Sequence, residues 1–170
     1  PPCSEIAVGL GFVIGGRVHY GDSFSAGEFK SILWKDGNRG QFSLDDNEVH
    51  RVEADHELFH RFIRELAAHI ALFVNSLNMN HVFLGGDIEK YRSEIYEVFI
   101  KEIQRNWPYP SKVECAVRFS SLGDKAVAYG AAGMLLEHLF LDQEFSKLAG
   151  GIDILQVISK RDSARSVGAV

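Results

Sequence analysis

Cysteine is scarce in this chain: Cys3 and Cys115 are its only two, and no C-x-x-C spacing occurs. We therefore expect both thiols to be reduced, as is usual for a cytoplasmic protein. Long apolar runs are missing as well. No run approaches the roughly 20 residues that cross a bilayer, and the sequence shows no basic and apolar leader of a secreted protein. We expect a cytoplasmic location and no membrane partner.

Positive charge is sparse and scattered. The 18 lysine and arginine residues are outnumbered by 23 acidic ones, which gives a formal net charge of −5. A surface that binds duplex DNA needs clustered lysine and arginine, so we predict that this chain does not contact nucleic acid directly. Apolar residues make up 46% of the 170 residues. That share is ordinary for a globular protein, and the length suffices for one domain with a sizeable core.

Glycine occupies informative positions near the start of the sequence. An apolar run over residues 6–14 is interrupted by Gly9 and Gly11, and the pair Gly15-Gly16 follows it. A Gly-Gly pair between two β-type runs predicts a hairpin, because both residues adopt positive φ without steric cost. Gly9 and Gly11 indicate either a kink in the strand or a close backbone approach, as to a nucleotide phosphate.

Further along, predicted strands and helices alternate. Apolar residues recur every three or four positions from about Asp55 to Leu77, which predicts a long helix with Asp55 as its N-cap. Turn-forming residues over 30–54 predict loops with one or two short strands. The later elements are expected to be a strand at 81–84, a helix ending before Pro108, a strand at 113–119 and a small-residue helix at about 125–140. This alternation indicates an α/β fold with a partly parallel sheet.

Three further motifs make the sequence recognisable: residues 21–29 (GDSFSAGEF), 82–88 (VFLGGDI) and 121–132 (SLGDKAVAYGAA). In this order and spacing, together with the glycines at the start, they resemble the C-terminal half of the ROK family of sugar kinases and sugar-responsive repressors. The resemblance implies a ribonuclease H-like, actin/hexokinase-like C-terminal lobe, with a mixed sheet that opens on a hairpin or meander and is flanked by helices. We assign this lobe to residues 1–140 and a C-terminal extension to residues 141–170.

The resemblance also implies a sugar site. In the family, the segment that matches Ala26-Gly27-Glu28 supplies a carboxylate that accepts hydrogen bonds from sugar hydroxyls. Glu28 is thus a predicted sugar ligand, with Ser31 beside it in an altered pocket. Where the family reads Glu-x-Gly-His, this chain reads Glu28-Phe29-Lys30-Ser31, and residues 32–54 contain no cysteine. We therefore expect the family's zinc site to be absent, and we predict no metal ligand and no resident cofactor.

The phosphate loop departs from the family in the same way. Family kinases read Gly-Thr-Gly-Ile-Gly where this chain reads Gly9-Leu10-Gly11-Phe12-Val13. Leu10 lacks the hydroxyl that touches a phosphate, and Val13 adds bulk where the backbone should approach it. Asp87 also replaces a common third glycine in the second motif. If this chain binds a nucleotide, ATP with magnesium, the contacts implied by the resemblance are Gly9, Gly11, Gly85, Gly86 and Gly123.

The resemblance leaves two hypotheses. The catalytic aspartate of ROK kinases belongs to a segment upstream of the matched region, so we predict no catalytic residue and no kinase activity for this chain alone. The favoured hypothesis is the C-terminal domain of a ROK-type transcriptional regulator. Such a domain senses a sugar or sugar-phosphate effector, forms a homodimer and reaches DNA only through an N-terminal domain absent from this chain. The alternative is a fragment of a ROK kinase that phosphorylates a hexose or a related sugar.

A third hypothesis comes from the residues alone. His56-Glu57-Leu58-Phe59-His60 matches H-E-x-x-H, the zinc-metalloprotease signature, in which two imidazoles lie one helical turn apart beside a glutamate base. The metzincin extension needs Gly and His where this chain has Ile63 and Leu66. Both histidines also border the apolar arc of the predicted helix, where partly exposed polar residues are expected. A zinc protease is therefore the most distant alternative.

Overall fold

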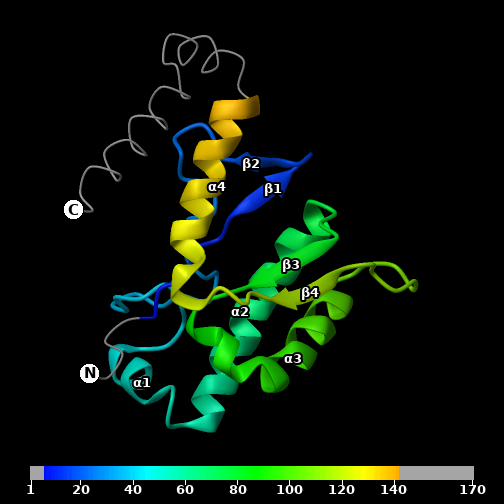
Figure 1. Cartoon of the computed structure of the whole chain (residues 1–170). Helices are drawn as coiled ribbons and strands as arrows, with labels where there is room; N and C mark the ends of the chain where they lie inside the picture. Colours follow the sequence, from blue (N-terminus) through cyan, green and yellow to red (C-terminus); the bar gives the residue numbers. More distant parts are fainter. Residues whose placement is uncertain (1–5, 142–170) are drawn as a thin grey trace, which may run out of the picture. The chain divides into compact units, whose positions relative to one another are not determined.

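The computed structural model describes residues 6–141 (Figure 1). Within them, residues 6–84 and 88–119 form one compact unit, and residues 85–87 and 120–141 form a second. The sequence did not indicate this division. Apart from its first residue, the predicted extension over residues 141–170 lies outside the described residues.

The first unit opens with the predicted hairpin. Strands β1 (Phe12–Ile14) and β2 (Arg17–His19) pair in antiparallel fashion, with Val13 opposite Val18. Gly15 and Gly16 have φ values of +60° and +78°. A two-residue turn of the type that matches strand twist needs positive φ at both positions, so the Gly-Gly pair explains the hairpin.

The short strands expected within residues 30–54 are not formed. A short helix, α1 (Asp46–Arg51), is found there instead. Asp45 and Glu48 form a capping box: the Asp45 carboxylate accepts from the Glu48 N–H at 2.9 Å, and the Glu48 carboxylate accepts from the Asp45 N–H at 3.0 Å. The strand prediction is wrong for two reasons: this reciprocal cap starts a helix at residues that also favour turns, and residues 31–34 form a turn in which the Trp34 N–H donates to the Ser31 carbonyl at 3.0 Å.

The long helix predicted from the apolar spacing is α2 (His56–Ser76). It begins after Asp55, whose side chain accepts hydrogen bonds from the backbone N–H groups of Glu57 and Leu58. The predicted N-cap is therefore confirmed, because those two donors have no partner inside the helix. One face of α2 is buried, including the fully buried Ile63.

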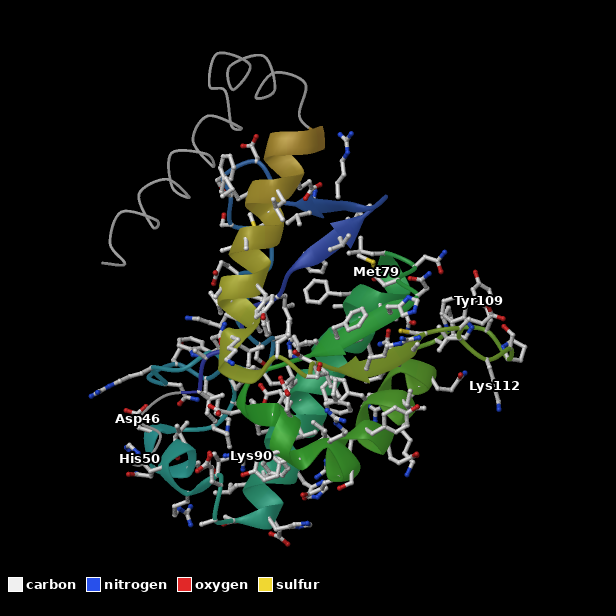
Figure 2. The ribbon with its side chains drawn as sticks, in the orientation of Figure 1. Asp46, His50, Met79, Lys90, Tyr109 and Lys112 are labelled. Carbon is white, nitrogen blue, oxygen red and sulfur yellow. The ribbon has the colours of Figure 1, made fainter. Side chains whose placement is uncertain are left out.

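A second helix packs against α2. It is α3 (Arg92–Arg105), which follows the 3-10 turn η1 (Asp87–Tyr91). Its inner face buries three apolar side chains that are at most 1% exposed: Ile95, Phe99 and Ile103. The helix ends before Pro108, as predicted, and the connection that follows carries Tyr109 and Lys112 (Figure 2).

Strands β3 (His81–Leu84) and β4 (Ala116–Phe119) form a parallel pair beside α2 and α3, with Val82 opposite Val117 (Figure 1). Both valines are buried in the core that the helices provide, whereas Phe83, on the other face of β3, is 68% exposed. The predicted strand at 81–84 is confirmed, and the one at 113–119 is shorter than expected.

The single mixed sheet that we predicted is not formed among residues 6–141: β1–β2 and β3–β4 are separate pairs. The backbone that leads into β1 makes its hydrogen bonds elsewhere. The Leu10 N–H donates to the Gly27 carbonyl, and the Val8 N–H donates to the Gln41 side chain. These donors are unavailable to a neighbouring strand, which explains the difference. The described chain is of mixed α/β type, and the ribonuclease H-like architecture stays a prediction.

The second unit contains the 3-10 turn η2 (Gly123–Lys125) and the helix α4 (Ala126–Leu141). The latter is the small-residue helix predicted at about 125–140. Val127 and Tyr129, near its start, are exposed. No helix within residues 6–141 has both the length and the apolar character needed to cross a membrane.

Candidate functional site

The segment with Gly9 and Gly11 lies against the loop that carries Glu28. The Leu10 N–H donates a hydrogen bond to the Gly27 carbonyl at 3.3 Å. Gly27 has a φ of +98°, and a Cβ at this position would lie 1.9 Å from the Leu10 carbonyl oxygen. Only glycine fits this contact. Two predicted site segments, residues 9–11 and the loop around Glu28, are thereby brought together.

The Gln41 side chain fixes the backbone on both sides of this contact. Its Oε1 accepts from the Val8 N–H at 2.6 Å, and its Nε2 donates to the Val8 carbonyl at 2.9 Å. The same Nε2 donates to the Phe29 carbonyl at 3.1 Å. The amide thus does for Val8 what a neighbouring strand would do. Phe29, the residue that follows Glu28, is held at a fixed distance from the start of the chain.

A buried carboxylate anchors the loop to α2. Glu65 is 5% exposed, and its side chain accepts hydrogen bonds from the hydroxyls of Ser31 and Ser43. Its Oε1 also accepts from the Ser43 N–H at 2.9 Å. A buried carboxylate needs such donors, because desolvation without them is strongly unfavourable.

His69 adds a second anchor one helical turn further along α2. Its Nδ1 lies 2.7 Å from the Glu65 carbonyl oxygen, and its Nε2 accepts from the Ile32 N–H at 3.1 Å. These contacts assign the hydrogen to Nδ1, since Nε2 must have a free lone pair to accept. The imidazole therefore joins the helix to the loop directly after Ser31.

Ser31 and Glu28, the two predicted sugar ligands, have different surroundings. The Ser31 side chain is buried, donates to Glu65 and accepts from the Leu33 N–H at 3.0 Å. The Glu28 carboxylate is exposed and has no hydrogen bond or ion pair among residues 6–141. Ser31 therefore anchors the loop, and its contact with a sugar stays a prediction. Lys30, between them, places its ammonium 3.8 Å from the centre of the Trp34 ring.

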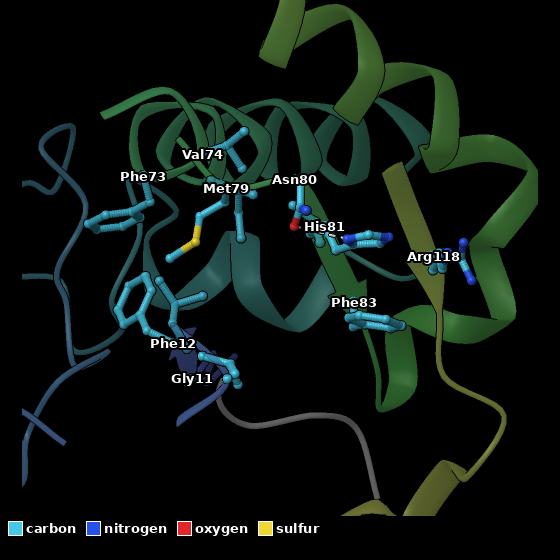
Figure 3. A pocket seen from close by; sticks show the side chains of 15 residues that line it. Gly11, Phe12, Phe73, Val74, Met79, Asn80, His81, Phe83 and Arg118 are labelled. Carbon is cyan, nitrogen blue, oxygen red and sulfur yellow. Dashed lines mark hydrogen bonds between the residues drawn. The ribbon is translucent and has the colours of Figure 1, made fainter. Parts of the chain in front are cut away.

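Gly9 and Gly11 line a cavity of about 700 Å³, whose walls come from residues 9–16, from α2 and from β3 (Figure 3). A Cβ at either glycine would meet no atom within 4 Å, so the backbone faces open space. The wall is largely apolar, and Phe12 and Phe73 meet edge to face with their ring centres 5.5 Å apart. The Leu10 side chain packs against the core.

The polar groups of the cavity gather at its β3–β4 end. His81 and Phe83 have nearly parallel rings, at 13° and 6.1 Å between centres. Arg118 of β4 lies beside Phe83, with which it is paired in the strand register. Figure 3 shows these side chains on one side of the cavity, with Met79 and Phe12 on the other. Such a cavity suits a ligand with an apolar body and one hydrogen-bonding or anionic end.

The remaining predicted nucleotide contacts lie in the second unit. Gly85 and Gly86 belong to residues 85–87, and Gly123 starts η2 in the same unit. Gly86 has a φ of +85° and Gly123 a φ of +52°, so both lie in the left-handed region of backbone conformation that favours glycine. The structure therefore groups these three glycines with one another.

Both histidines of the H-E-x-x-H sequence lie in the first two turns of α2. Their rings approach Glu94 in the first turn of α3, and no pattern in the sequence links this glutamate to the two histidines. Glu65, His69, Ser43 and Gln41 were missed as well. Glu65 and His69 fall on the apolar stripe of α2, and a charged or polar residue there signals a buried partner.

A scan against protein-family models and searches of curated proteins and solved structures found no match.

Proposed function

We propose that this chain is the C-terminal effector-sensing and dimerisation domain of a cytoplasmic ROK-type transcriptional regulator, with no kinase activity of its own. Its effector is a sugar or sugar-phosphate, and DNA is contacted only through an N-terminal domain outside this chain. The observation that supports the proposal best is the Glu28 loop, which presents an exposed carboxylate from a segment fixed at both ends.

The fixed loop matters because a polyhydroxy ligand is held by directional hydrogen bonds. A carboxylate on a flexible loop must be ordered when the ligand binds, which weakens binding. Here Gly27 is held by Leu10, Phe29 is held by Gln41, and Ser31 is held by Glu65. One of these contacts precedes Glu28 in the sequence and two follow it. The Glu28 backbone is therefore already ordered, and its carboxylate can accept hydrogen bonds from sugar hydroxyls with little further loss of freedom.

The surroundings of Gly9 and Gly11 favour a regulator over a kinase. Phosphoryl transfer needs a base for the attacking hydroxyl and oxygen ligands for magnesium. No carboxylate lines the cavity within residues 6–141, and the Leu10 side chain packs into the core. The alternative, a fragment of a ROK sugar kinase, is favoured by the open space at both glycines and by Arg118, which could meet a phosphate.

The dimerisation part of the proposal draws on α4. This helix exposes a set of large apolar side chains whose burial would stabilise an interface: Val127, Tyr129, Leu135 and Leu136. Light scattering of the protein that contains this chain tests this part, with Leu135→Glu expected to convert a homodimer into a monomer. A dimer that is unaffected by Leu135→Glu and Val127→Glu excludes α4 as the interface.

The sensing part is tested by calorimetric titration with a panel of sugars and sugar-phosphates, with and without ATP and magnesium. We expect one sugar to bind without dependence on ATP and without turnover. Glu28→Gln should weaken that binding at least about tenfold, because a neutral amide accepts weaker hydrogen bonds. Glu97→Gln, an exposed glutamate on α3, is the matched control and should bind as the unmodified protein does.

Three results would contradict the proposal. A phosphorylated sugar formed with ATP would establish the kinase alternative. Unchanged sugar binding in Glu28→Gln would exclude Glu28 as a ligand. A complete absence of binding across the panel would remove the sensing role.

A further inference from the structure

Three side chains from two helices converge at a place that the proposed function does not use. His56 and His60 lie one turn apart at the start of α2, and Glu94 reaches them from the first turn of α3. The Nε2 atoms of the two histidines are 3.1 Å apart. Glu94 Oε1 lies 3.3 Å from His56 Nε2 and 2.9 Å from His60 Nε2.

These three distances match those between ligand atoms of a tetrahedral metal ion. Zinc binds imidazole nitrogen and carboxylate oxygen at about 2.0 to 2.2 Å, which places neighbouring ligand atoms about 3.3 Å apart. Two imidazoles and one carboxylate are also an established donor set for zinc with an open fourth position. Each distance taken alone is also that of a hydrogen bond or an ion pair, whereas one bound ion would account for all three ligand atoms lying together.

The hydrogen bonding of Glu94 is a second, independent observation. Its Oε1 is shielded from solvent, yet it accepts no hydrogen bond within the described part of the chain. The nearest polar atoms are the two Nε2 atoms of His56 and His60. Buried carboxylate oxygens are normally satisfied, and a cation bound between this oxygen and the two imidazole nitrogens would satisfy it.

The surroundings leave room for a fourth ligand. His56, His60 and Glu57 line a solvent-accessible cavity of about 630 Å³, whose other walls include Arg61 and Arg64. Both arginines are engaged elsewhere: Arg61 pairs with Glu48, and the Arg64 Nε donates to the His60 carbonyl at 3.3 Å. A water molecule could therefore reach an ion held by the three side chains.

We propose that His56, His60 and Glu94 bind one divalent transition-metal ion of the zinc class, with a solvent-accessible fourth position. The ion joins the first turns of α2 and α3, and it stabilises the first unit. This differs from the sequence prediction that no residue is a metal ligand, because Glu94 completes a set that the H-E-x-x-H pair begins. The proposal concerns binding only, and it does not depend on the proposed sensing function.

The test is a titration of the tag-free, chelator-treated chain with Zn²⁺ alone, followed by calorimetry and thermal unfolding. We expect one ion per chain and a rise in Tm of about 5 °C at saturation. His56→Ala and Glu94→Gln should each weaken binding more than about tenfold. The His56 side chain is 78% exposed, so its removal leaves the fold intact, and circular dichroism of each variant checks this.

His50→Ala is the matched control, because His50 is an exposed histidine on α1 outside the cluster (Figure 2). It should bind zinc with unchanged affinity. Cobalt serves as a spectroscopic probe: tetrahedral nitrogen and oxygen coordination gives visible d–d bands without a sulfur charge-transfer band. The proposal is overturned by binding that survives in both His56→Ala and Glu94→Gln, by a cobalt–thiolate band that indicates a cysteine site, or by no binding at micromolar zinc.

Discussion

Two parts of the first unit differ in how far they depend on polar contacts. The α2–α3–β3–β4 region is held by apolar side chains that are almost fully buried, such as Ile63, Ile95 and Phe99. The loop over residues 20–44 has no regular secondary structure, and at its end Phe42 and Leu44 are buried in the same apolar core. Its other contacts are the close approach at Gly27 and hydrogen bonds to the Gln41 amide, the Glu65 carboxylate and the His69 imidazole. Apolar packing tolerates small shifts, whereas each polar contact depends on one particular atom. The comparison predicts global instability for damage to the first region and local opening for damage to the second.

The largest effect is expected in the apolar region. Phe99→Ala should lower the free energy of unfolding by about 4 kcal/mol, because Phe99 is 0% exposed and its removal leaves a large cavity. Chemical denaturation followed by circular dichroism measures this. Tyr96→Ala is the control on the same helix: Tyr96 is 40% exposed and should contribute much less. Equal losses for the two variants would mean that α3 does not pack as described.

The next largest effect is a difference in stability between alanine substitutions at Gly27 and at Gly9. Gly27→Ala should lower the free energy of unfolding by about 2 to 3 kcal/mol, because its φ is positive and its Cβ would collide with the Leu10 carbonyl. Gly9→Ala should change it by less than about 0.5 kcal/mol, since a Cβ there meets nothing within 4 Å. Denaturation of both variants makes the comparison. A Gly27→Ala protein as stable as Gly9→Ala would show that the loop does not lie on residues 9–11.

A smaller and more local effect is expected at Glu65. Glu65→Gln replaces a carboxylate that accepts from two serine hydroxyls with an amide that has only one accepting oxygen. We expect a loss of about 1 to 2 kcal/mol. Hydrogen exchange should accelerate in residues 29–43 and stay unchanged in α3. Exchange that accelerates equally in both regions would contradict the distinction between local and global damage.

The smallest effect concerns a partly buried ion pair between α1 and α2. The hydrogen bond from Arg61, followed by that from the Asp45 N–H, lowers the pKa of Glu48. A lowered folded-state pKa gives stability that is present above the unfolded-state pKa and is lost as the pH falls through the folded-state value. Arg61→Gln should therefore lower stability at pH 7 by less than about 1 kcal/mol, because Arg61 is 43% exposed.

Denaturation of the Arg61→Gln protein from pH 7 down to pH 3 checks that prediction. The difference from the unmodified protein should shrink as the acid end is reached. A difference that grows at low pH would show that Glu48 is not the group responsible.

The difference between the two regions also explains which features could be predicted from the sequence. The bounds of α2 could be predicted closely because apolar periodicity and the Asp55 cap are both local signals. The Gln41 contacts link residues 33 positions apart, and no local pattern marks them. In the cluster of His56, His60 and Glu94, the two histidines are visible as H-E-x-x-H, but Glu94 lies 34 positions beyond His60 and becomes a neighbour only when α3 packs on α2.

Gln41 has one more consequence, which concerns the chemical ageing of the protein. Its amide oxygen accepts from the Val8 N–H while its amide nitrogen donates to two carbonyls, so both ends of the group are needed. Deamidation would replace the nitrogen with a second oxygen, which repels both carbonyls. A change that leaves the side chain almost the same size would thus detach the Glu28 loop from residue 8, so that aged preparations lose the loop's order before they lose their fold.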